Sequence, residues 1–159
     1  MKGIDIQIES LRSYFEDLLF NGFDTIFYGR CMRNYRDGMI PEVLKSGAKE
    51  YTEVLLNDRF DVLSFFDVES ARTLNEATVN IYFAVNLSVI YSTVNERATE
   101  YALSEIVMLI KRHGLFEITG ITDGYESWKD WDKVKKEDNM QPYYLFRIET
   151  KVTYNLICS

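Results

Sequence analysis

Apolar residues recur at steps of three and four near the start of the chain, which is the spacing of one face of an α-helix. They occupy these positions: Ile4, Ile8, Leu11, Phe15, Leu18 and Leu19. Arg12 and Glu16 lie one turn apart on the polar side, where they can pair. Asn21-Gly22 indicates the end of this helix, and Thr25 to Tyr28 predict a short strand after it.

A long run of alternating apolar and mostly polar residues extends from Val79 to Tyr91. Period two over this length predicts a strand with one buried and one partly polar face. A second helix is expected to follow, because Thr93 and Glu96 fit a capping box and Gly114 suits a helix end. Its apolar positions spread beyond one stripe: Val94, Ala98, Tyr101, Ala102, Leu103, Ile106, Val107, Met108, Leu109, Ile110 and His113. Such a helix is covered on more than one side, by its own domain or by a neighbour.

The remaining segments predict further strands and two excursions. Strands are expected over 115–121 and 144–156, and a hairpin is expected from 51–55 and 60–68 around Asn57-Asp58. Residues 29–48 read as a loop, with a turn of helix after Pro41, and 70–77 as a second loop. The order favours an α+β fold: a mainly antiparallel sheet with two main helices packed on one face. We expect a single domain over 1–159, with loop excursions near 29–48 and 123–141.

The outer faces of the two long strands are expected to be exposed. They carry these apolar residues: Tyr82, Ile90, Tyr143, Leu145 and Ile157. If either strand forms an edge of the sheet, a neighbouring subunit could continue the sheet there.

Composition and charge restrict the class of protein. Aromatic residues make up 14% of the 159 residues, which argues against disorder. The net charge of −7 lacks the basic footprint of a protein that grips nucleic acid, although an acidic surface can line a conduit for DNA by repelling it. The polar start of the chain predicts no signal peptide, and 81–91 is too short to span a bilayer. Cys31 and Cys158 are expected to be reduced thiols.

No catalytic constellation stands out. The single histidine, His113, lies at a predicted helix end, where a cation is favoured for structural reasons. Three near pairs of carboxylates lie in or beside polar turns, where such residues are common: Asp58 with Asp61, Asp67 with Glu69, and Asp130 with Asp132. Glycine-rich phosphate loops and zinc-type ligand spacings are absent from the sequence. We therefore expect no enzyme activity, no cofactor and no metal.

Two segments are candidates for contacts with neighbouring subunits. The first is the basic stretch after the first strand, with Arg30, Arg33, Tyr35, Arg36 and Lys45. The second contains Trp128, Trp131, Lys133 and Lys135. Acidic residues cancel much of the second segment's charge, so a protein contact is favoured over stacking on nucleic-acid bases. For the first segment, docking on protein is likewise favoured over phosphate.

The order of elements resembles the tail-terminator, tail-completion and neck ring proteins of tailed bacteriophages. The matching pieces are the long strand 81–91, the helix 96–113 and the closing strand that contains Tyr143-Tyr144-Leu145-Phe146-Arg147-Ile148. The resemblance covers the first helix and most of the chain from Tyr51 onward, whereas 30–47 has no counterpart. It is a similarity of order and length rather than of a diagnostic motif.

The resemblance implies a structural connector that closes into a homo-oligomeric ring of roughly six or twelve copies. Its expected neighbours are portal, neck or tail proteins, with double-stranded DNA passing through the ring without sequence-specific binding and with no membrane. The expected location is the virion, after assembly in the host cytoplasm. Two alternatives remain: a monomeric or dimeric regulatory or adaptor module, and a small-molecule-binding α+β domain or enzyme whose aromatic residues line a pocket.

Overall fold

The computed structural model describes residues 3–29, 31–34, 40–44, 51–53, 60–69, 75–91, 97–124, 126–128 and 143–154. The helices are α1 (Ile4–Leu18), α2 (Leu87–Ile90) and α3 (Ala98–His113). The strands are β1 (Thr25–Tyr28), β2 (Cys31–Asn34), β3 (Ile40–Leu44), β4 (Tyr51–Glu53), β5 (Val62–Val68), β6 (Glu76–Asn86), β7 (Phe116–Asp123) and β8 (Tyr143–Thr153).

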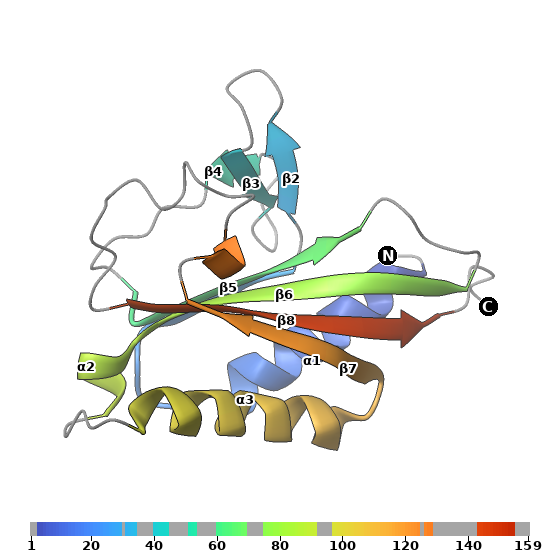
Figure 1. Ribbon diagram of the computed structural model, residues 1–159. Helices are drawn as coiled ribbons and strands as arrows, with labels where there is room; N and C mark the ends of the chain where they lie inside the picture. Colours follow the sequence, from blue (N-terminus) through green and yellow to red (C-terminus); the bar gives the residue numbers. More distant parts are fainter. Residues whose placement is uncertain are drawn as a thin grey trace.

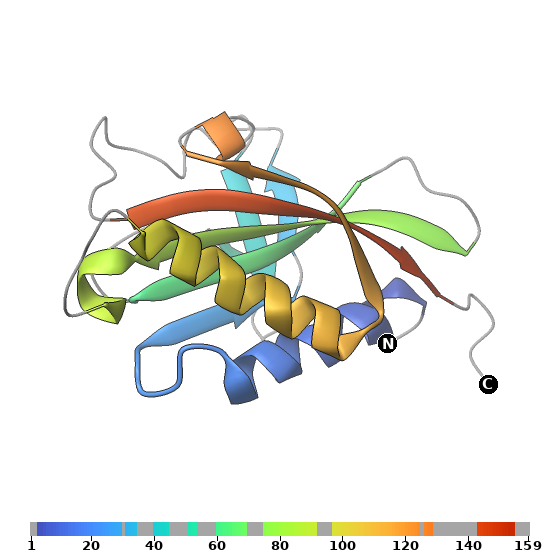
Figure 2. The same ribbon diagram turned by 60° about the horizontal axis from the view of Figure 1, so that its bottom comes forward.

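Five strands form the main sheet in the order β1-β5-β6-β8-β7, and β2, β3 and β4 form a smaller sheet. Only β1 pairs parallel to its neighbour in the main sheet, and the other pairs are antiparallel. Helices α1 and α3 lie on one face of the main sheet, and the small sheet lies on the other (Figures 1 and 2). The α+β class, with a mainly antiparallel sheet and two main helices on one face, is therefore confirmed.

The larger core fills the space between the two long helices and the sheet. Phe15 of α1 lies at its centre and packs against the rings of Phe27, Phe66 and Phe83. From α3, the side chains of Ala102, Ile106 and Ile110 enter the same core. These positions are the inner stripes that helical spacing predicted, so burial of one apolar face accounts for both helices.

A second cluster covers part of the sheet's other face, which we call the second face. Its buried members are Tyr28, Leu63, Phe65, Tyr82, Ala84, Trp128 and Leu145. The predicted exposure of Ile90 is wrong, because it is buried in the larger core from α2. The prediction that Tyr82 and Leu145 are exposed is wrong as well. Their side chains lie under Trp128, which belongs to a single turn of 3₁₀ helix at 126–128. The even-numbered positions of β6 are thus buried like the odd-numbered ones, and β6 has no solvated face between Val79 and Val85.

Several local predictions differ from the structure. Residues 31–34 and 40–44, expected in a loop, form β2 and β3, and the segment after Pro41 is strand rather than helix. The expected hairpin of 51–55 with 60–68 is also wrong, because β4 pairs with β3 in the small sheet. The long central strand ends at Asn86, where the chain enters α2. Residues 92–96, with the predicted capping box, lie outside the described residues.

Neither long strand is an edge of the main sheet. Strands β6 and β8 pair with each other over eleven residues at its centre, and β1 and β7 are the edges. Strand β7 has a register irregularity between Ile118 and Gly120, where the carboxylate of Glu149 occupies the space that a Cβ at Gly120 would need. Such bulges are common on edge strands, where they interrupt regular pairing.

Candidate assembly surfaces

One line of apolar side chains on α3 points away from the core. Tyr101, Met108 and Leu115, the last just beyond the helix end, are spaced by seven residues and are 49%, 44% and 48% exposed. Tyr101 and Met108 are two helical turns apart and so lie on one side of the helix, and Leu115 follows directly after the helix cap, Gly114. We call them the outer line of α3. Tyr101 and Met108 belong to the apolar positions that were expected to be covered by the chain's own domain or by a neighbour. The ring of Tyr101 packs against that of Tyr91, and both side chains remain about half exposed.

A shallow groove runs beside this line. It has a volume of about 470 Å³ and is lined by Ser104, Val107, Met108, Lys111 and Arg112. Lys111 and Arg112 are exposed in the last turn, where cations interact favourably with the helix dipole. Gly114 ends the helix in the left-handed conformation with φ of 85°, as its position predicted. The groove therefore joins apolar and basic groups on a well-formed helix.

The edge strand β7 continues from this end of α3. Among the described strands it pairs only with β8, and its other edge has no strand beside it. The side chains of Glu117, Thr119, Ile121 and Asp123 are exposed and alternate with more buried ones. Strand β7 and the outer line of α3 thus border the molecule on one flank, where both apolar side chains and backbone groups are accessible.

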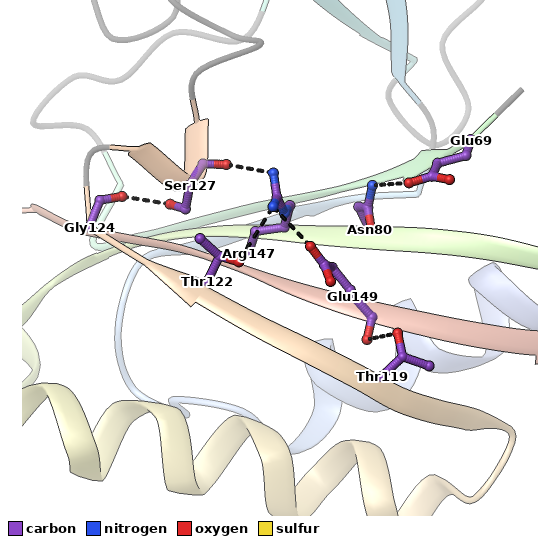
Figure 3. A network of polar contacts seen from close by, with 8 residues as sticks. All are labelled: Glu69, Asn80, Thr119, Thr122, Gly124, Ser127, Arg147 and Glu149. Carbon is purple, nitrogen blue, oxygen red and sulfur yellow. Dashed lines mark hydrogen bonds and ion pairs between the residues drawn. The ribbon is translucent and has the colours of Figure 1, made fainter.

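The second face carries a polar network next to its apolar cluster (Figure 3). Arg147 of β8 donates to the backbone carbonyl of Ser127 and to Thr122 Oγ1, and its Nη2 lies 2.9 Å from Glu149 Oε1. Ser127 Oγ in turn donates to the carbonyl of Gly124. These bonds fasten the 126–128 turn to the sheet, so the network is explained by the seating of that turn over the second cluster.

Beyond the turn, the same face carries several carboxyl groups. The carboxyl group of Glu69 accepts a hydrogen bond from Asn80, and Glu149 lies one strand further across the sheet. Asp67 pairs in register with Asn80 and is buried. Glu149 is paired with Arg147, and Glu76 is paired with Lys151, so the charges of this face are mixed. The described residues contain no group of three or more His, Cys, Asp or Glu side chains placed to hold a metal ion.

A contact between α1 and α3 joins two residues that can serve as nucleophile and base in enzymes. Ser10 Oγ lies 2.9 Å from His113 Nε2. In catalytic triads a third group orients the histidine through its other nitrogen. Among the described residues His113 Nδ1 has no hydrogen-bond partner, and the ring packs against Tyr14 and Phe116. The pair therefore lacks the third member, and its surroundings are those of a helix-to-helix contact.

The predicted contact residues are placed as follows. Trp128 is 0% exposed: its ring packs edge-on against Phe65 and Tyr82, and its Nε1 donates to the carbonyl of Phe146. The tryptophan thus belongs to the chain's own core. Arg33 lies in β2, next to Pro41 in register. The other predicted contact residues lie outside the described residues: Arg30, Tyr35, Arg36, Lys45, Trp131, Lys133 and Lys135.

Comparison with known proteins adds no relative. No family model, curated protein or solved structure matches this chain. Within the described ranges, none of the helices combines the length and apolarity that crossing a bilayer requires.

Proposed function

We propose that this chain is a structural subunit that assembles with copies of itself into a ring, as a connector in a phage virion. The observation that carries self-assembly is the outer line of α3, together with the outer edge of β7, which pairs with no other described strand. Exposed apolar side chains that line up on one flank are typical of protein contact surfaces, whereas scattered ones are not. The helix was expected to be covered by its own domain or by a neighbour. Because its outer side is exposed in the single chain, we assign this cover to a neighbouring copy.

The virion assignment is supported by the order of elements. A first helix, a long central strand, a long helix and a closing strand are the features on which the resemblance to tail-terminator and neck proteins rests. In the structure these are α1, β6, α3 and β8. The acidic net charge suits a ring through which DNA passes without adhering.

The test is the mass of the purified chain in solution, measured by light scattering. We expect a species several times heavier than the 18.7 kDa chain. Replacing Tyr101, Met108 and Leu115 together by glutamine, which keeps helix propensity at the two helical positions, should return the mass to that of the monomer. The unfolding free energy should change little, because exposed positions rarely contribute more than about 0.5 kcal/mol.

The matched control is Val89→Gln. Val89 is an exposed apolar residue on α2 and lies off the outer line of α3. It should leave the assembled mass unchanged. A wild-type chain that remains monomeric at every concentration, or a triple variant that assembles as well as wild type, would count against the proposed function.

A further inference from the structure

A second exposed surface lies at the end of α1, and unlike the outer line of α3 it contains charged residues. Leu18 and Phe23 are 47% and 36% exposed, and the carboxylates of Asp17 and Asp24 are exposed beside them. We call these four residues the α1 patch. The sequence from Phe15 to Asp24 contains no Lys, Arg or His, so the α1 patch is acidic and apolar.

The acidic residues of the α1 patch lie where the helix itself disfavours them. Asp17 is in the last turn of α1, and that turn contains no basic residue. The carbonyl groups at a helix C-terminus carry partial negative charge, which favours cations and disfavours carboxylates. Neighbouring Glu16 is paired with Arg12, but Asp17 has no such local reason for its position. A cation brought from outside the helix would offset this unfavourable arrangement.

The end of α3 presents the opposite charge. We define the α3 patch as Val107, Met108, Lys111, Arg112 and Leu115, four of which line the groove. The sequence from Ile106 to Phe116 contains no Asp or Glu. The α3 patch is therefore basic and apolar, and it can supply the cations that the α1 patch lacks.

The two patches lie toward opposite ends of the helix layer. Helices α1 and α3 run in opposite directions across the sheet, as the colours of Figure 2 show. Each patch lies at or near the C-terminal end of its helix. One copy can therefore present its α3 patch to the α1 patch of the next copy.

We infer that the α3 patch of one copy docks onto the α1 patch of a second copy. This inference rests on the proposed function, which it deepens by naming the two surfaces. Lys111 and Arg112 meet Asp17 and Asp24, while Met108 and Leu115 pack against Leu18 and Phe23. Two α3 patches facing each other would place like charges together, so a two-fold contact through this surface is disfavoured. A contact between different patches is heterologous, and it closes into a ring when the rotation between copies allows.

Charge exchange tests this contact. The first variant, Lys111→Glu with Arg112→Glu, has two acidic patches, and the second, Asp17→Lys with Asp24→Lys, has two basic ones. Each variant alone should lose the assembled species and show the mass of a monomer by light scattering. Mixed in equal amounts they should assemble again, because every contact between unlike chains is then complementary. A chain with all four substitutions should also assemble by itself.

Two controls exchange charges on the second face, away from both patches. Lys151→Glu and Glu126→Lys should leave the assembled mass unchanged. Recovery in the mixture requires that both variants fold, so a failure to fold is recognised by circular dichroism of each variant alone. If wild type assembles and both charge-exchanged variants assemble equally well, the inference is overturned while the proposed function stands. If the variants lose assembly and the mixture of folded variants does not recover it, the pairing of these patches is also wrong. A wild-type chain that never assembles overturns both.

Discussion

His113 joins the end of α3 to the middle of α1 through Ser10. Its Nδ1 is buried without a hydrogen-bond partner among the described residues, and burial lowers the pKa of the imidazole below its ordinary value of 6.5. The folded protein therefore favours the neutral ring. Protonation would place a charge between the rings of Tyr14 and Phe116 and weaken the contact between the helices.

This gives a pH prediction with a defined sign. The unfolded chain binds the proton more readily than the folded one, so the unfolding free energy should fall as pH falls below about 6.5. In His113→Gln this part of the slope should disappear. Urea unfolding at several pH values between about 7.5 and 5.5 measures it.

Two other titratable groups do not affect the comparison between wild type and His113→Gln. The pKa of Glu9 is lowered by its hydrogen bond to Arg12, so its contribution to stability is lost only under more acidic conditions. Burial raises the pKa of Glu105, which works in the opposite direction, but wild type and His113→Gln share that effect. Equal slopes in the two proteins would show that His113 is not the group responsible.

Substitution of Trp128 distinguishes a role in the core from a role at a subunit contact. Sequence alone favoured an interface, since tryptophan is common at contact surfaces, but the residue is enclosed by Phe65, Tyr82 and Leu145. Trp128→Ala should lower the unfolding free energy by about 3–5 kcal/mol, and Trp128→Phe by less, because the phenyl ring refills part of the space. Urea unfolding gives both values. A normally stable Trp128→Ala that no longer assembles would instead place the indole at a subunit contact.

Among the elements, those with long and regular periodicity were predicted from sequence. Helix α1, β7 and β8 occupy close to the expected ranges, because one face of each packs on the main core or its neighbours. The small sheet was not predicted. Its strands are three to five residues long, and a turn of helix was expected after Pro41. Pro41 pairs in register with Arg33 of β2, and the described residues of β4 pair with Glu42, Val43 and Leu44.

The faces of elements were harder to predict than the elements themselves. Alternation in β6 predicted one partly polar face, but Tyr82 and Ala84 of that face lie in the second cluster. These two side chains are covered by Trp128, which is more than forty residues away in the sequence. On α3, Tyr101 and Met108 were expected to be covered by the chain's own domain or by a neighbour, and both are about half exposed in the single chain. Periodicity identifies apolar residues but does not identify the surface that each one meets.

For the whole molecule, charge and apolar surface are distributed unevenly. Basic groups gather at the end of α3 and acidic groups at the end of α1, although the chain has a net charge of −7. The sequence predicted a helix in need of cover and an acidic chain, but it could not identify these two patches, because their residues come together only through the fold. The residues that the sequence predicted for subunit contacts, in the arginine-rich and tryptophan-containing segments, belong to neither patch. Subunits with two unlike, complementary ends are suited to closed rings.

Electron micrographs of the negatively stained wild-type protein test the central claim most directly. Averaged images of the assembled species should show closed rings with rotational symmetry and an open centre, as expected for a connector around DNA. Compact two-fold dimers, open filaments or monomers alone would contradict the account, because none of them is a closed ring of heterologous contacts.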